Sequence, residues 1–307
     1  MRLQVALAAI SVLSAAVPAL AETRVALIVG NGNYDKPALR LVNPANDATA
    51  MERALQSAGF RTIVRINARR IDFYRAVDQF GALIGADPHA VGLFYYAGHG
   101  VQAGGTNYLI PVDADIQSEA DLEAGAFDVD RVLRSMRDAQ NDLNIVILDA
   151  CRDNPLPRTR GIERGLARMN APNGTFIAYA AAPGQTAEDG SIGANGIFTG
   201  EFIKAMAEPG VPLEQMFKRV ITGVKADTRG RQQPWSEASV QGDFYFHAVA
   251  ADGAARVRPA PAAAPLHAAP ASSARSPDDP CEQILMRAQV GEPLDDSQRA
   301  YLKENCR

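Results

Sequence analysis

The chain has 307 residues, of which 47% are hydrophobic and 21% charged, and its formal net charge at pH 7 is −4. A chain of this length and composition can bury a substantial core, which indicates a globular protein of one large or two medium domains. The mildly acidic balance, with no basic cluster interleaved with aromatic residues, argues against a nucleic-acid partner.

Residues 1–21 have the pattern of a secretory signal peptide. Arg2 precedes an apolar stretch over 3–17, and the small residues at 19–21 suit a signal peptidase. The alternative is an uncleaved membrane anchor, but the stretch is short for a span and lacks stop-transfer flanks. No later stretch approaches the length of a span. We therefore expect a mature protein that begins at Glu22, lies in the periplasm or outside the cell, and has no membrane span.

Strand and helix patterns alternate from residue 24 onward. The apolar run RVALIVG (24–30) predicts a buried parallel strand. Asn43 and Pro44 predict the start of a helix that Gly59 ends. Further strands are expected at 60–66, 90–98 and 144–150, with a small hairpin over 101–110. The helices between them are expected to bury Ile71, Tyr74, Val77 and Phe80 in one case, and Val129, Val132, Leu133 and Met136 in the other.

The second half of the chain continues the alternation and then changes composition. A fifth strand is expected at 175–182, helices near 198–207 and 213–226, and a short aromatic strand DFYFH at 243–247. The pattern predicts an α/β fold with a mostly parallel six-stranded sheet and helices on both faces, over residues 22–249. Residues 250–280, rich in proline and alanine, predict an extended linker. Residues 281–307 predict a small helical hairpin.

Three cysteines in an exported chain cannot all pair within one molecule. Cys281 and Cys306 flank the C-terminal segment and could form a disulfide in an oxidising compartment, which leaves Cys151 as the unpaired thiol. The alternative for Cys151 is a small, inert core residue.

His99 and Cys151 each directly follow an expected strand. Functional groups gather at the carboxyl ends of parallel strands, so the two side chains would meet if their strands are neighbours. A thiol beside an imidazole can be deprotonated and act as a nucleophile in acyl transfer. The backbone N–H groups of Gly100 and Cys151 would then stabilise the oxyanion.

Several motifs resemble those of the caspase and metacaspase superfamily of cysteine peptidases. YYAGHG (95–100) is similar to the family's histidine motif and LDACRD (148–153) to its cysteine motif, and His99 and Cys151 are 52 positions apart. The similarity extends to RVALIVGNGNY (24–34), NPANDATAM (43–51) and PGQTAED (183–189). The resemblance implies a caspase-like three-layer sandwich, catalytic His99 and Cys151, and peptide or protein substrates.

The resemblance also implies a substrate preference. Asp149 stands two residues before the cysteine, where caspases have glutamine, and Asp47 occupies the other pocket position in the form that metacaspases use. Two carboxylates at the base of the S1 pocket would bind Arg or Lys and repel an acidic residue. The alternative for Asp47 is an ordinary acid in the first turn of a helix.

The segment after the nucleophile departs from the family pattern. Metacaspases usually continue with His-Ser-Gly, whereas this chain reads Arg152-Asp153-Asn154, and Asp153 adds negative charge that disfavours a thiolate. The loop at 152–174 is rich in arginine and lies where relatives are cut into two subunits, so self-processing is one interpretation and a solvated basic loop the other. The arginines concerned are Arg158, Arg160, Arg164 and Arg168.

Other signals are weaker. Gly30-Asn31-Gly32 lacks the third glycine of a dinucleotide loop, and His99 with Cys151 gives too few ligands for a metal, so no cofactor and no metal are expected. Calcium activation, known in some metacaspases, stays open because the pattern locates no acidic cluster. Trp235 either packs or lines the cleft, and His89, His247 and His267 are expected at the surface or at strand ends. The alternative to a peptidase is an inactive caspase-like scaffold.

Overall fold

The structure is a computed structural model of the full chain. It describes residues 22–150, 162–163, 165–183, 185, 187–188, 190–191, 193–249, 297–298 and 301. The chain divides into two compact units, Met1–Ala250 and Ala251–Arg307, and the described part of the first carries the fold. Cys151, the expected signal peptide, the linker and nearly all of the C-terminal hairpin, with Cys281 and Cys306, lie outside the described residues.

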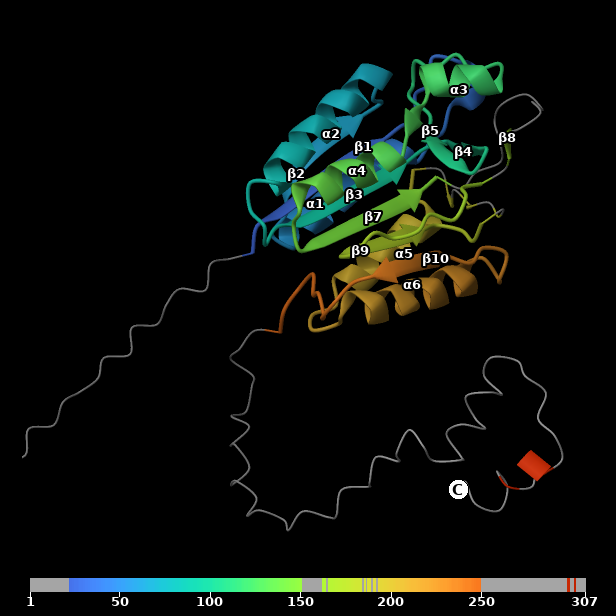
Figure 1. Cartoon of the computed structure of the whole chain (residues 1–307). Helices are drawn as coiled ribbons and strands as arrows, with labels where there is room; N and C mark the ends of the chain where they lie inside the picture. The colour runs from blue at the N-terminus through green and yellow to red at the C-terminus, as the bar shows by residue number, and fades with distance from the viewer. Residues whose placement is uncertain are drawn as a thin grey trace, which may run out of the picture. The chain divides into compact units, whose positions relative to one another are not determined.

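A six-stranded sheet runs through the middle of the first unit (Figure 1). Its strand order is β10-β9-β7-β3-β1-β2, and every neighbouring pair is parallel except β10 with β9. The strands are β1 (Arg24–Gly30), β2 (Arg61–Ile66), β3 (Val91–Ala97), β7 (Leu143–Asp149), β9 (Thr175–Tyr179) and β10 (Trp235–Ser239). The central strands β3 and β7 are buried almost throughout, as continuous apolar runs predict for strands covered on both faces.

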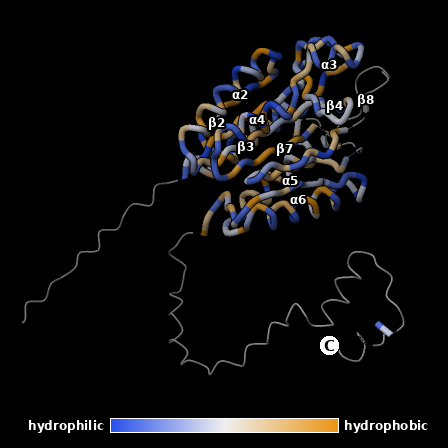
Figure 2. Tube along the Cα trace, viewed as in Figure 1, coloured by the Kyte–Doolittle hydropathy of each residue, from blue (hydrophilic) through white to orange (hydrophobic). Residues whose placement is uncertain are grey.

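Helices cover both faces of this sheet. The helices are α1 (Pro44–Ser57), α2 (Arg70–Ile84), α4 (Asp130–Ala139), α5 (Ile197–Met206) and α6 (Leu213–Asp227). The apolar side chains of α2 and α4 pack on one face, and those of α1, α5 and α6 on the other. Figure 2 shows the same arrangement as apolar colour along β3 and β7, with helices that alternate between apolar and polar colour. The predicted three-layer α/β architecture is confirmed.

A second, four-stranded sheet lies at the end of the molecule toward which the arrowheads of β3 and β7 point (Figure 1). Its order is β6-β5-β4-β8, with β4 (Gly100–Ala103) and β5 (Thr106–Leu109) forming the predicted hairpin. The other elements here are the 3-10 helix η1 (Pro37–Leu39), α3 (Glu119–Gly125), β6 (Phe127–Asp128) and β8 (Ile162–Glu163). A separate apolar cluster around Tyr34 and Val101 fills this region. The sequence did not indicate α3, whose seven residues are too few to show a periodic pattern.

The sixth strand of the main sheet is not the predicted one. Residues 243–247 are irregular, although Phe244 and Phe246 are buried, and the sixth strand is β10, where Trp235 pairs with Tyr179 of β9. The backbone acceptors of 244–247 explain the difference. The carbonyl of Phe244 accepts from the Leu213 N–H, and the carbonyl of His247 accepts from the Gly210 N–H. The Arg24 guanidinium donates to the carbonyls of Tyr245 and Phe246. These four carbonyls are therefore not part of a strand ladder.

One helix face also differs from the prediction. Ile71 of α2 is half exposed, whereas Phe73, Val77, Phe80 and Ile84 are buried against the sheet. The buried stripe of α2 therefore begins at Phe73, two residues later than predicted. Within the described part of the chain, no helix has the length and apolarity needed to cross a membrane.

Candidate active site

The two strands that precede His99 and Cys151 are neighbours in the sheet. β3 pairs in parallel with β7, with Ala97 opposite Asp149, and the Gly98 N–H donates to the Asp149 carbonyl at 3.2 Å. The histidine and cysteine motifs therefore follow neighbouring parallel strands, as their meeting requires. Both strands end one residue earlier than predicted, so His99 stands two positions beyond its strand.

Gly98 forms the turn that leads from β3 to His99. Its φ of 155° belongs to a region that favours glycine, and a Cβ at this position would lie 2.5 Å from the Tyr96 hydroxyl. The next residue but one, Gly100, packs against Ala150, since a Cβ on Gly100 would lie 3.0 Å from the Ala150 Cβ. Ala150 is the residue bonded to Cys151. The chain thus brings the backbone beside His99 against the residue that precedes the thiol, whose own position lies outside the described residues.

The imidazole of His99 is only 5% exposed and has a defined tautomer. Its Nε2 lies 2.8 Å from the Leu39 carbonyl oxygen. Because a carbonyl can only accept, Nε2 carries the hydrogen in the neutral ring, and Nδ1 is the basic nitrogen. The His99 N–H donates to the Tyr34 hydroxyl at 2.9 Å, and the Tyr34 ring packs on the imidazole with 4.9 Å between centroids.

The N–H of Gly100 points away from the hairpin partner strand. Ile110 donates its N–H to the His99 carbonyl, and Gly100 stands opposite Leu109. In an antiparallel ladder the residue after a hydrogen-bonded pair turns its N–H outward, away from β5. This orientation suits a donor to an oxyanion.

The two predicted pocket acids lie close together and are both buried. Asp47, in the first turn of α1, is 0% exposed, and Asp149, at the end of β7, is 3% exposed. A Cβ placed on Gly196 would lie 3.2 Å from Asp47 Oδ2 and 3.4 Å from Asp149 Oδ2, so both carboxylates approach the same point. The Gly196 N–H donates to Asp47 Oδ1 at 2.8 Å. Asp47 is therefore not a solvated helix-dipole acid.

A second set of contacts, which the sequence did not indicate, holds Asp149. The Thr199 hydroxyl donates to Asp149 Oδ2 at 2.8 Å and lies 2.6 Å from the Tyr95 hydroxyl. Thr199 is a polar residue on the apolar face of α5, between Phe198 and Phe202. Buried polar groups need hydrogen-bond partners. A threonine on the apolar face of this helix was therefore the sequence signal that could have identified Thr199.

The described residues before α5 are tied to the start of α1 and to Arg231, which follows α6. The amide of Asn43 donates to the Ser191 carbonyl and that of Asn46 to the Gly193 carbonyl. On the other side, Arg231 binds Glu188 through two hydrogen bonds of 2.8 and 2.9 Å. This ion pair lowers the pKa of Glu188, mainly through the hydrogen bond from Arg231.

The remaining residues marked in the sequence lie elsewhere. His89 is exposed and bonds Asp142 at 2.8 Å, which raises the pKa of His89, and His247 is half-buried. Trp235 is 38% exposed on the edge strand and donates to Glu237. Asn31 is buried and cross-links Ala68 with Ile110. Among the described residues, no group of three or more His, Cys, Asp or Glu could hold a metal ion.

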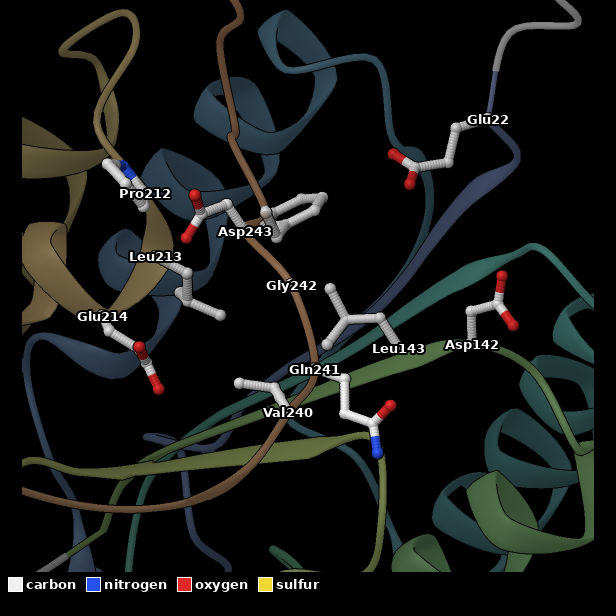
Figure 3. A pocket seen from close by; sticks show the side chains of 11 residues that line it. Glu22, Asp142, Leu143, Pro212, Leu213, Glu214, Val240, Gln241, Gly242 and Asp243 are labelled. Atoms are coloured by element: carbon white, nitrogen blue, oxygen red, sulfur yellow. The ribbon is translucent and has the colours of Figure 1, made fainter. Parts of the chain in front are cut away.

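A separate cavity of about 150 Å³ lies at the amino-terminal ends of β7 and α6 (Figure 3). Apolar side chains line it, including Leu143, Leu213 and Val240, and four carboxylates surround them: Glu22, Asp142, Glu214 and Asp243. Leu143 and Asp149 stand at opposite ends of β7. This cavity is therefore distinct from the strand-end region that holds His99.

The fold and the strand-end histidine define an α/β protein of the caspase-like class. The family model described as the caspase domain matches residues 23–245, and the chain belongs to this family of cysteine-type peptidases. The chain is 32% identical over 134 residues to human mucosa-associated lymphoid tissue lymphoma translocation protein 1, and 31% identical to the mouse homolog over the same length. Each match covers 43% of this chain and 15% of the relative, so the chain spans only a small part of those proteins.

A solved structure supports the same fold. The Drosophila initiator caspase Dronc superposes with a TM-score of 0.54 and 13% sequence identity, over 73% of this chain and 82% of the caspase chain. At this identity the similarity concerns the fold alone. The predicted caspase-like architecture is confirmed.

Proposed function

We propose that this protein is an exported cysteine endopeptidase that cleaves after Arg or Lys, with His99 and Cys151 as a catalytic dyad. The observation that carries the specificity is the meeting of two buried carboxylates, Asp47 and Asp149, beside Gly196. Asp149 also ends the strand that leads to Cys151, so a side chain bound by the pair would place its own carbonyl near the thiol.

The chemistry is acyl transfer through a thioester. The Cys151 thiol gives its proton to Nδ1 of His99, and the sulfur attacks the carbonyl carbon of the scissile bond. The C–N bond then breaks as the imidazolium returns the proton to the departing amine. Water, deprotonated by the same nitrogen, hydrolyses the thioester and releases the acid and the thiol. The hydrogen bond from Nε2 to Leu39 supports this role, because it places the hydrogen of the neutral ring on Nε2 and leaves Nδ1 as the basic nitrogen.

The Gly100 N–H, together with that of Cys151, would stabilise the negative oxygen of each tetrahedral intermediate. The outward direction of the Gly100 N–H and the packing of Gly100 on Ala150 support this assignment. A preorganised donor of this kind contributes roughly a hundredfold to a thousandfold in rate.

A fluorogenic peptide series tests the proposal. Peptides that end in Arg, Lys, Asp or Leu before the fluorophore are compared under reducing conditions, with and without calcium, and with Cys151→Ala as control. We expect turnover of the Arg and Lys peptides only, and none with the variant. Hydrolysis that persists in Cys151→Ala would overturn the dyad, and equal turnover of all four peptides would overturn the basic specificity.

We also propose self-cleavage in the arginine-rich segment at 152–174, of which residues 152–161 and 164 lie outside the described residues. Its composition supports the idea, since a basic-specific peptidase would recognise its own arginines. Incubation of purified protein beside Cys151→Ala, with mapping of new termini, is the test. Fragmentation of the active protein alone is expected, and fragmentation of both proteins or of neither contradicts self-cleavage.

Export by cleavage after residue 21, into the periplasm or the medium, is proposed from the sequence pattern at 1–21. N-terminal sequencing of the protein recovered from its producing cell is expected to begin at Glu22. The linker at 250–280 and a hairpin at 281–307, closed by a disulfide between Cys281 and Cys306, are proposed on composition and spacing. A mass shift of two hydrogens on reduction tests the disulfide.

A further inference from the structure

The Asp149 carboxylate is held by a side chain from the helix α5, which begins 48 positions further along the chain. Thr199, in the first turn of α5, donates its hydroxyl hydrogen to Asp149 Oδ2 at 2.8 Å. Both residues are buried, with Thr199 at 0% and Asp149 at 3% exposure. Water therefore contributes little to orienting this carboxylate, and its direction depends on protein donors.

The hydrogen bonds run in one direction. An ionised carboxylate can only accept, so the single hydrogen of the Thr199 hydroxyl is used toward Asp149. The Tyr95 hydroxyl, 2.6 Å from the Thr199 oxygen, must then be the donor of that second bond. The chain Tyr95 to Thr199 to Asp149 links β3, α5 and β7, and successive hydrogen bonds of this kind polarise one another.

The same helix also sets the position of the second carboxylate. Gly196, which precedes the first turn of α5, donates its N–H to Asp47 at 2.8 Å. The amino-terminal end of α5 thus contacts both acids, one through a backbone donor and one through Thr199. A guanidinium is a rigid planar fork, so its recognition depends on where carboxylate oxygens are fixed.

We propose that Thr199 is a specificity-determining positioning residue, which fixes Asp149 for a cationic side chain of the substrate, with Tyr95 as the second link. This inference rests on the proposed preference for Arg and Lys. It assigns to α5 a task beyond packing: the helix holds the acidic pair at a set separation. The alternative is that the three side chains only satisfy one another's buried polar groups.

The test measures binding in the full-length Cys151→Ala protein, so that chemistry is not involved. Two peptides are compared that differ only in arginine against citrulline, its neutral isostere. The ratio of the two dissociation constants is measured for four forms of the protein: the Cys151→Ala parent, and the same chain with Thr199→Val, Thr199→Ser or Tyr95→Phe. Val keeps the shape of Thr without the hydroxyl, Ser keeps the hydroxyl, and Phe removes only the outer donor.

We expect the parent to prefer arginine and Thr199→Val to reduce that preference about tenfold, the effect of losing one hydrogen bond to a charged group. Thr199→Ser should stay close to the parent, and Tyr95→Phe should fall between the two. Citrulline affinity should change little in all variants. If Thr199→Val does not fold, the ratio of the two dissociation constants in Tyr95→Phe and Thr199→Ser decides between the proposal and its alternative.

The outcomes separate the two proposals. A parent protein that binds neither peptide, or both equally, overturns the proposed specificity itself. A parent that prefers arginine, with a preference unchanged in Thr199→Val and Tyr95→Phe, overturns the positioning role alone. Equal loss of affinity for arginine and citrulline peptides would mean a structural role for Thr199 and would also overturn it.

Discussion

His99 is fixed by partners on both its ring and its backbone. The Leu39 carbonyl accepts from Nε2, while the Tyr34 hydroxyl accepts from the backbone N–H and the Tyr34 ring packs against the imidazole at a tilt of 47°. Tyr34 follows β1, and Leu39 ends a short 3-10 helix, so the loop after the first strand determines how a residue far along the chain is oriented.

Removal of the Tyr34 hydroxyl is expected to lower kcat. In Tyr34→Phe the ring beside the imidazole stays, but the buried His99 N–H loses its acceptor, which destabilises the fold by about 1–3 kcal/mol and lets the backbone at His99 shift. We expect kcat to fall about tenfold or more with little change in KM, because nucleophile alignment and not substrate binding is affected.

The matched control for this substitution is Tyr245→Phe, which removes a hydroxyl that donates to Asp243 at the surface. Urea unfolding and steady-state kinetics on both variants give the comparison. Equal kinetics for Tyr34→Phe and the wild type would show that the Tyr34 hydroxyl does not orient His99.

Gly196 is the second residue with a sharp expected effect. Its φ of −53° is open to alanine, so Gly196→Ala should fold, but the added methyl group would press on both Asp47 and Asp149. We expect kcat/KM for Arg peptides to fall about tenfold through KM, with stability within about 1 kcal/mol of wild type. Gly200→Ala in the same helix is the control, since its methyl group would meet only Asn195, at 3.9 Å.

A Gly196→Ala protein that cleaves Arg peptides as well as Gly200→Ala does would show that the space beside the carboxylates is not used. Thermal unfolding of both variants separates this outcome from a loss of structure.

The sequence could identify the acids and the histidine of the site but not the groups that orient them. His99, Asp47 and Asp149 stand in local motifs, next to strand ends or in a first helical turn. Thr199 and Gly196 act through contacts with residues about 50 and 149 positions away, which no local pattern encodes. Leu39 contributes a carbonyl, which every residue type carries, so its identity gives no signal.

At the scale of elements, Arg24 joins the start of the sheet to the end of the domain. Its guanidinium donates to the carbonyls of Ala58, Tyr245 and Phe246 at 2.9–3.1 Å and lies 4.8 Å from the centre of the Phe244 ring. These contacts hold the segment 244–246 over the helices α1 and α5, where Phe244 and Phe246 complete the core.

Replacement of Arg24 is expected to release this segment. Arg24→Gln should lower the free energy of unfolding by about 2–3 kcal/mol, because three carbonyls lose a charged donor and two rings, those of Phe60 and Phe244, lose a cation. Arg24→Lys should lower it by less, since Lys keeps the charge but not the planar fork. Arg61→Gln, on the exposed edge strand β2, is the control. Denaturant titration ranks the free energies of unfolding of the three variants. Equal stability of the Arg24 and Arg61 variants would show that the Arg24 contacts do not hold the segment 244–246 in place.

The same segment shows why the sixth strand was placed wrongly. The alternation in DFYFH correctly predicted that Phe244 and Phe246 are buried, but burial alone does not make a strand. The strand is WSEAS, at 235–239, which has no aliphatic run and becomes β10 because its backbone pairs with β9. Interior strands such as β3 and β7 can be predicted, because helices cover both of their faces and their sequences are therefore continuous apolar runs. An edge strand depends on a partner that its own sequence does not show.

For the whole molecule, acid is expected to lower the stability, because several carboxyl groups have lowered pKa values in the fold. The Arg231 hydrogen bond lowers the pKa of Glu188 from 4.5, backbone and hydroxyl donors at Gln117 and Ser118 lower that of Asp121 from 3.8, and Lys36 lowers that of Asp115. A lowered value in the folded state means a contribution that is present above the unfolded value and lost as pH falls through the folded one.

The contribution of Glu188 should therefore be complete above about pH 4.5 and lost below it, whereas that of His89, whose pKa is raised by Asp142, is lost as pH rises. Burial raises the pKa of Asp130 and opposes the acid effect in part. We expect Glu188→Gln to flatten the acid side of a plot of unfolding free energy against pH, by about 0.5–1 kcal/mol at most because the pair is partly exposed. Glu123→Gln, which removes an exposed carboxylate on α3, is the control. Identical acid limbs for Glu188→Gln and wild type would show that the Glu188–Arg231 pair does not stabilise the fold.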